Sequence, residues 1–142
     1  MILPDVNVLV SAYREDAFAH ERTKRWLEDR INGPSPFGVA DRVLEGFIRV
    51  VTHPRVFNPP AELAAALEFV AVLVDRENCV RVAPGARQWS LFVDLAARTG
   101  AVGNSVADAW LAALAIESGS EWITWDRGFA RYPGLKWSAP AD

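Results

Sequence analysis

Apolar and polar positions divide the chain into short apolar runs and longer segments in which apolar residues recur with helical spacing. The apolar runs predict strands at residues 2–3, 37–39, 80–82 and 122–125, with a further edge strand at 136–137. The longer segments predict helices at residues 6–13, 19–31, 41–51, 60–74, 86–98 and 105–118. Short strands that alternate with helices are typical of a parallel α/β sheet, so we expect that fold class.

The segment 105–118 is nearly uncharged, since only Asp108 and Glu117 carry charge in it. A helix that is apolar all round is usually buried, and Gly119 is placed to end it. A carboxylate on such a helix needs a partner, because burial disfavours its charged form.

Two interpretations supply a partner for Asp108. In the first, Ser105 is the N-cap of the helix and Asp108 completes a capping box. In the second, Asp108 binds a divalent cation together with other carboxylates. Asp126 has the same two readings, because it either caps a short helix that begins at Arg127 or serves as a ligand.

Two other acids bear on this choice. Asp5 and Asp126 each follow a predicted strand, and ligands of α/β sheets bind beyond the carboxyl ends of the strands. If these two strands are neighbours, both carboxylates lie at one edge of the sheet. Glu45 falls on the polar side of its helix, where an ion pair with Arg49 would explain it equally well. Pro4 is expected to end the first strand, because proline cannot donate to a ladder.

The composition favours one domain over residues 1–142, with 51% hydrophobic residues and a mass of 15.7 kDa. No apolar run approaches the roughly 20 residues that span a bilayer, and the N-terminus is unlike a signal peptide, so we expect a cytoplasmic protein. A single cysteine, Cys79, makes a zinc site improbable. We expect His20 to be an exposed helix residue and His53 a helix-end residue, neither of them a general base.

The net charge does not favour nucleic-acid binding, which usually goes with a basic domain or a basic face. The net charge is −3, and thirteen of the fifteen basic residues are arginine. Clustered carboxylates repel one another unless a cation lies among them, and Mg²⁺ or Mn²⁺ prefers oxygen ligands. Because a bound divalent cation activates water near neutral pH, the acids predict metal-dependent phosphoryl chemistry.

Four segments carry a resemblance to a known family. They are DVNVLV from Asp5, LEGFIRVVTHPRVF around Glu45, GNSVADAWLAALAIESG around Asp108 and EWITWDRGFARYPGLKW around Asp126. In this order and spacing they resemble the PIN-domain ribonucleases, and most of all the VapC toxins of bacterial toxin–antitoxin pairs, particularly a branch common in mycobacteria. The likeness spans nearly the whole chain.

The resemblance implies a three-layer α/β/α fold with a short, mostly parallel central sheet of four to five strands. It also implies a catalytic quartet around Mg²⁺ or Mn²⁺, supported by two polar neighbours. The quartet is Asp5, Glu45, Asp108 and Asp126, and the neighbours are Asn7 and Thr124. Read without the resemblance, Asn7 is a helix-start residue and Thr124 a β-former. Pro4 and Trp125 depart from the family pattern.

The implied function is that of a toxin, an endoribonuclease that cuts cellular RNA of the tRNA or rRNA class with metal-activated water. The implied partners are RNA, a VapB-like antitoxin and a second copy of the chain. With the antitoxin the chain would form a heterotetramer or a larger assembly, and no association with a membrane is expected. For the homodimer we expect the N-terminal helices to form the contact, through Phe18, Trp26 and Leu27. An antitoxin arginine is expected to insert among the four acids.

Two alternatives stay open at this point. A phosphatase of the haloacid-dehalogenase type would need a carboxylic acid two residues after its nucleophilic Asp, and Asn7 stands there. A non-catalytic RNA- or partner-binding module on the same fold is the other alternative, because fold does not fix function.

Overall fold

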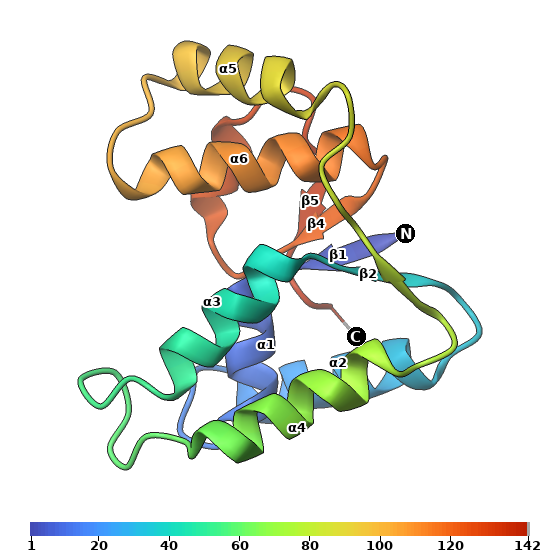
Figure 1. Cartoon of the computed structure of the whole chain (residues 1–142), viewed down its shortest axis with the longest axis vertical. Helices are drawn as coiled ribbons and strands as arrows, with labels where there is room; N and C mark the ends of the chain where they lie inside the picture. The colour runs from blue at the N-terminus through green and yellow to red at the C-terminus, as the bar shows by residue number, and fades with distance from the viewer. Residues whose placement is uncertain (142) are drawn as a thin grey trace.

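Strands and helices alternate along the chain as the sequence pattern predicts (Figure 1). The computed structural model describes residues 1–141. Within them the strands are β1 (Ile2–Pro4), β2 (Phe37–Val39), β3 (Cys79–Arg81), β4 (Glu121–Ile123) and β5 (Trp137–Ser138). The helices are α1 (Val6–Tyr13), α2 (His20–Asn32), α3 (Asp41–Val51), α4 (Leu63–Val74), α5 (Gln88–Thr99), α6 (Asn104–Glu117) and the 3-10 helix η1 (Arg127–Arg131). Most predicted ends differ from these by one or two residues.

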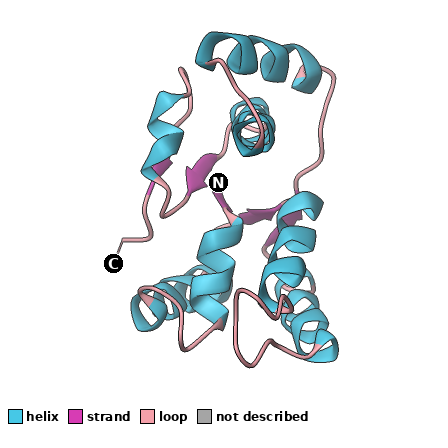
Figure 2. Ribbon diagram, turned by 90° about the vertical axis from the view of Figure 1, so that its left-hand side faces the viewer, coloured by secondary structure: helices cyan, strands magenta, loops and turns pink. Residues whose placement is uncertain are grey.

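The strands form one parallel sheet in the order β3-β2-β1-β4-β5. Strand β1 is central, and the chain order reverses between β1 and β4. Helices lie on both sides of the strands (Figure 2). The predicted three-layer α/β/α fold with a short parallel sheet is therefore confirmed.

Helix α6 lies against the sheet through its smallest side chains. Ala109, Ala112, Ala113 and Ala115 are all fully buried, and α6 contacts both α5 and β4. Side chains of this size let a helix backbone approach its neighbours closely, so the near absence of charge in this segment reflects its place between two layers.

Pro4 is the last residue of the central strand β1, so the expectation that proline ends this strand is confirmed. It stands opposite Ile123 of β4, and the next residue, Asp5, donates its backbone N–H to the Ile123 carbonyl at 2.8 Å. The missing N–H of Pro4 therefore faces the β2 side, because N–H groups alternate between neighbours along a parallel strand. On that side the pairing is limited to Ile2 and Phe37, so a proline costs little there.

Helix α4 begins three residues later than the predicted helix at residues 60–74. The backbone N–H of Ala61 donates to the carbonyl of Val51 at 2.8 Å. This hydrogen bond joins the segment before α4 to the end of α3. The helix therefore starts only after the chain leaves that contact, with Glu62 as its extended N-cap residue.

Three side chains of α2 that were expected either to be exposed or to form the dimer contact are buried. His20 is 9% exposed, and its Nδ1 lies 2.9 Å from the Ser11 carbonyl. Trp26 and Leu27 belong to the core at 5% and 4% exposure, so they do not present a dimer contact, and that expectation is wrong for them. His53, by contrast, is exposed just beyond α3 as predicted.

Helix length and polarity also bear on the membrane question. In the part of the chain that the structure describes, no helix is both long enough and apolar enough to cross a bilayer.

Candidate active site

The four predicted acids line one cavity of about 800 Å³. Asp5 directly follows β1 and Asp126 follows β4, and these two strands are paired neighbours. Asp108 comes from the second turn of α6, and Glu45 from α3. The cavity therefore lies at the carboxyl ends of the strands, where the strand order reverses and α/β sheets bind their ligands.

Asp5 is the buried member of this group, at 7% exposure. It is the N-cap residue of α1, and its Oδ1 accepts the backbone N–H of Val6 at 2.7 Å. Its Oδ2 accepts the Thr124 hydroxyl at 2.7 Å and the Asn7 amide at 3.0 Å. Three donors therefore hold this carboxylate in one orientation.

Asn7 and Thr124 also connect Asp5 to the segment that carries Asp126. The Asn7 side chain donates from Nδ2 to Thr124 Oγ1 at 3.0 Å and accepts the Trp125 backbone N–H at 3.0 Å. Thr124 Oγ1 accepts the Asp126 backbone N–H at 3.0 Å. Asn7 is thus more than a helix-start residue, and Thr124 lies just beyond β4 rather than within it. Both make the contacts that a supporting role requires.

The electrostatics show that three of the acids act on one another. Burial raises the pKa of Asp5 to about 6, against the lowering effect of the Thr124 and Val6 hydrogen bonds, and the charges of Asp108 and Asp126 raise it further. The pKa of Asp108 is also raised, first by burial and then by the Asp126 charge. A cation among these three carboxylates would relieve both effects.

The capping-box interpretation of Asp108 is wrong. The N-cap of α6 is Gly103, whose backbone has φ 57° and ψ −127°, a region that suits only glycine. Ser105 lies inside the helix, and its hydroxyl exchanges hydrogen bonds with the backbone of Val102. Asp108 therefore lies too far along the helix to cap it, and its carboxylate remains available to the cavity.

For Asp126 the capping interpretation is right, and it does not exclude the other. Its Oδ1 accepts the Gly128 backbone N–H at 2.7 Å, which caps η1. The cap uses only Oδ1, so Oδ2 can still bind a ligand in the cavity. Asp126 is exposed and lines the cavity while it caps.

Glu45 likewise shows both predicted features. It is exposed, and its Oε1 lies 3.7 Å from Nε of Arg49, the expected ion pair. It still reaches the cavity because the next residue, Gly46, lets α3 approach the start of α1. A Cβ built on Gly46 would lie 2.8 Å from Val6 Cγ2, so a larger residue would separate the two helices.

As the side chains stand, no group of three or more His, Cys, Asp or Glu within residues 1–141 is close enough to hold a metal ion. The chemistry of the donors nevertheless fits a hard divalent cation, since Asp5, Asp108 and Asp126 supply only oxygens and repel one another. Asp5 is fixed by hydrogen bonds, whereas burial and neighbouring charges alone perturb Asp108.

Several residues of this cavity were not predicted as part of the site. Arg42 and Arg49 line it from α3, at three residues before and four after Glu45. That spacing places all three on one helix face, so helical periodicity would have found the arginines. Phe18 and Trp125 also line the cavity, and no local pattern joins them.

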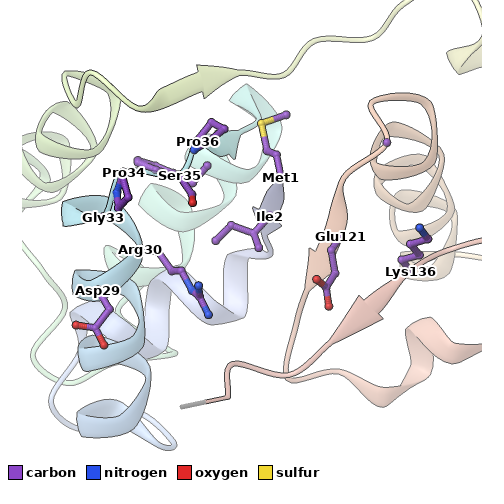
Figure 3. A pocket seen from close by; sticks show the side chains of 12 residues that line it. Met1, Ile2, Asp29, Arg30, Gly33, Pro34, Ser35, Pro36, Glu121 and Lys136 are labelled. Carbon is purple, nitrogen blue, oxygen red and sulfur yellow. The ribbon is translucent and has the colours of Figure 1, made fainter.

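A second cavity, of about 400 Å³, lies at the opposite end of the sheet (Figure 3). Met1 and Ile2 line it beside Arg30, with Glu121 and Lys136 across the opening. Its acidic and basic side chains are mixed, so it lacks the concentrated charge of the first cavity. The amino ends of parallel strands are also not where such sheets bind ligands.

Comparisons with known proteins identify the same family that the motifs resemble. Residues 2–135 match the PIN domain family. "Ribonuclease VapC43" of Mycobacterium tuberculosis is 44% identical over 142 residues, which cover 100% of this chain and 97% of the relative. "Ribonuclease VapC33" of the same species is 32% identical over 140 residues, 99% of this chain and 98% of the relative.

Two solved structures share the fold. VapBC2 from Rickettsia felis, bound to a DNA fragment from its promoter, superposes with a TM-score of 0.69 at 16% identity, covering 98% of each chain. VapC20 of Mycobacterium tuberculosis, a Sarcin-Ricin loop cleaving toxin, gives 0.67 at 14% identity, covering 95% of this chain and 98% of the other.

Proposed function

Because the chain belongs to the PIN domain family, and within it to the VapC group, we propose that it is the toxin of a type II toxin–antitoxin system and a divalent-cation-dependent endoribonuclease. The observation that carries the proposal is the meeting of Asp5, Asp108 and Asp126 at the reversal of strand order, where burial and then the charges of neighbouring acids raise the pKa of Asp5 and of Asp108. The phosphatase alternative has no support left, since the PIN match covers the whole site.

The residues of the site have two proposed roles, cation binding and orientation of the cation's ligands. Asp5, Asp108 and Asp126 would hold Mg²⁺ or Mn²⁺, and Glu45 completes the acidic wall. When bound there, the cation supplies activation of water and neutralisation of phosphate charge. Thr124 and Asn7 keep the Asp5 carboxylate turned into the cavity.

Two arginines at the same cavity suit the substrate's backbone. Arg42 and Arg49 lie beside the acids on α3, and a guanidinium fork matches a phosphate. They bring positive charge to a protein whose net charge is −3. A phosphodiester can therefore approach the acidic cavity along the α3 wall, next to Glu45.

The proposed reaction is hydrolysis of an RNA phosphodiester by water. It leaves a 5′-phosphate and a 3′-hydroxyl, and the 2′-hydroxyl of the RNA takes no part as nucleophile. We propose tRNA or rRNA as the substrate class, since structured RNAs present their unpaired bases in loops that a protein can read. Substrates with a 2′-deoxyribose at the cut position should still be cleaved.

The test is to map new 5′ ends in cells that express the wild type or Asp5→Asn, and then to assay the purified protein on the RNA found. Asp5→Asn, Glu45→Gln, Asp108→Asn and Asp126→Asn should each abolish cleavage while the protein stays folded. Asp94→Asn is the matched control, because Asp94 is exposed on α5, where it pairs with Arg98. Cleavage that continues undiminished in EDTA would refute the metal-dependent mechanism.

The same experiment addresses the non-catalytic alternative. A module that only binds RNA or a partner would yield no new 5′ ends in the wild type, and the four acidic variants would bind RNA as the wild type does. Loss of cleavage in the variants with retained fold separates the two readings.

We also propose a VapB-like antitoxin as the partner, since the solved structures of this fold include the VapBC complexes of Rickettsia felis and Haemophilus influenzae. A partner arginine inserted among the four acids would neutralise them through charge-assisted hydrogen bonds and exclude the cation. Co-expression of a small gene adjacent to this one should relieve growth arrest and yield a complex. Persistent arrest without a complex would contradict the proposal.

Homodimerisation stays a prediction, and with it the heterotetramer or larger assembly. Of the three residues expected at the dimer contact, only Phe18 is exposed. Light scattering of the purified chain at micromolar concentration measures the assembly directly, and a monomer would contradict it.

A further inference from the structure

Phe18 is a large aromatic side chain left open to solvent beside the acidic cavity. It is 74% exposed, although Phe side chains in this chain are otherwise largely buried or half-buried. Its ring meets that of Trp125 at a centroid distance of 5.3 Å, with the two planes at 87°. Both residues line the cavity that holds Asp5 and Asp126. A ligand that covers the Phe18 ring would gain binding free energy, because the exposed surface of this side chain is apolar.

Hydrogen bonds hold the Trp125 ring and the backbone that carries Phe18. Trp125 donates its indole N–H to Thr23 Oγ1 at 3.2 Å, and its backbone N–H to Asn7 Oδ1 at 3.0 Å. On the other side, the Ser11 hydroxyl donates to the Phe18 carbonyl.

The turn that presents Phe18 is specified at one further point. The next residue, Ala19, has φ 54°, a left-handed conformation that alanine seldom adopts. Its carbonyl accepts both the backbone N–H and the hydroxyl of Thr23, at 2.9 and 2.8 Å. These hydrogen bonds stabilise a backbone conformation that is unfavourable for alanine, directly after the exposed Phe18.

The charge around the two rings favours a nucleic acid as their ligand. The Arg22 guanidinium lies over the Trp125 ring at 5.4 Å, and Arg22 is exposed. Aromatic side chains stack on unpaired bases, and a nearby guanidinium suits the phosphate that joins them. The rings are also continuous with the proposed catalytic acids through Asn7, so a base on them would adjoin the reacting phosphate.

We propose that Phe18, supported by its edge-to-face contact with Trp125, is a stacking platform for an unpaired nucleobase next to the phosphodiester that is cut. This inference rests on the proposed ribonuclease function and identifies part of its substrate recognition. It restricts cleavage to RNA in which the base on one side of the cut is unpaired. Neither residue is a ligand of the cation, so the platform acts on substrate binding rather than on the chemical step.

The test uses the RNA fragment found by 5′-end mapping, with 2-aminopurine or an abasic residue placed in turn at each nucleotide around the cut. We expect 2-aminopurine fluorescence to be quenched at one position by the wild type and by Phe18→Tyr, measured in EDTA so that no cleavage occurs. Phe18→Ala should lose the quenching and raise KM about tenfold, within the range of one base–aromatic stack, with little change in kcat. Trp89→Ala is the matched control, because Trp89 is 67% exposed on α5, away from the cavity.

The abasic substrate separates stacking from a structural effect of the substitution. Removing the stacked base should weaken RNA binding by the wild type about as much as the Phe18→Ala substitution does. The abasic RNA should bind Phe18→Ala no more weakly than the intact RNA does. Equal sensitivity of both proteins to the abasic residue would overturn the platform. So would a Phe18→Ala variant that loses antitoxin affinity but keeps its RNA kinetics, since Phe18 would then serve the protein partner. If the purified wild type quenches the mapped fragment but does not cleave it when Mg²⁺ is added, the proposed function is overturned and the platform is supported.

Discussion

Asp5 should make the free protein less stable at neutral pH than at mildly acidic pH. Its pKa is about 6 in the folded chain, against 3.8 for an unperturbed carboxyl. Because the folded-state pKa is raised, the stability that this group contributes is fully present below the unfolded value of 3.8. It is lost as the pH rises through about 6. Asp5→Asn removes the titration, and with it this part of the pH dependence.

The expected size follows from the two pKa values. Raising a carboxyl pKa from 3.8 to about 6 amounts to about 3 kcal/mol of unfolding free energy between the fully protonated and fully ionised limits. About 2 kcal/mol of this falls between pH 4 and pH 7.5. Asp5 is 7% exposed, so solvent screening takes little from this figure.

Asparagine also changes the hydrogen bonds, but in a way that does not depend on pH. Oδ2 of Asp5 accepts from both Thr124 and Asn7, and an amide nitrogen in its place cannot accept. The variant is therefore expected to lose about 1–3 kcal/mol at every pH. The difference between the two pH profiles isolates the charge from this constant offset.

The assay is urea unfolding of the wild type and Asp5→Asn from about pH 4 to about pH 7.5, with EDTA present throughout. The stability of the variant relative to the wild type should rise by about 2 kcal/mol across this range. Asp94→Asn, on the surface of α5, should run parallel to the wild type. Parallel profiles for the wild type and Asp5→Asn would refute the reasoning, because they would mean that burial and neighbouring charges do not raise the Asp5 pKa.

Three further predictions concern the same site. Mn²⁺ added near pH 7.5 should raise the melting temperature of the wild type but not that of Asp5→Asn, and an equal rise in both would place the binding elsewhere. Thr124→Val removes a hydrogen bond that lowers the Asp5 pKa, so the acidic limb of the pH–activity profile should move to higher pH; an unmoved limb would contradict this. Gly46→Ala brings a Cβ within 2.8 Å of Val6 Cγ2 and should cost about 1–3 kcal/mol in urea unfolding, together with activity. Full activity of that variant would show that α3 need not lie so close.

Much of the fold and the site follows from local pattern. Hydrophobic periodicity located every strand and helix, because side-chain burial repeats with the geometry of the element itself. Two acids that each follow a strand were expected at one edge of the sheet, and Asp5 and Asp126 lie there because parallel strands share their direction. The pair of Glu45 and Arg49 was predictable for the same reason, since i,i+4 neighbours on a helix meet whatever surrounds them.

The failed predictions concern features that hydrophobic pattern and simple capping motifs do not decide. Ser105 looked like an N-cap, but Gly103 takes that place through a backbone conformation that no sequence pattern near Asp108 requires. His20 is buried because its ring nitrogen finds the carbonyl of Ser11 in the preceding helix.

The tertiary structure alone decided how the site is assembled. Thr124 and Asn7 come from opposite ends of the chain, and they meet at Asp5 only because β1 and β4 pair. Phe18 and Trp125 also come from distant parts of the sequence, and their rings meet only in the folded chain. A periodic pattern reports which face of an element is buried, but not which element covers that face. The pKa of Asp5 and the exposure of Phe18 depend on that second fact, because burial and charge act through space and not along the sequence.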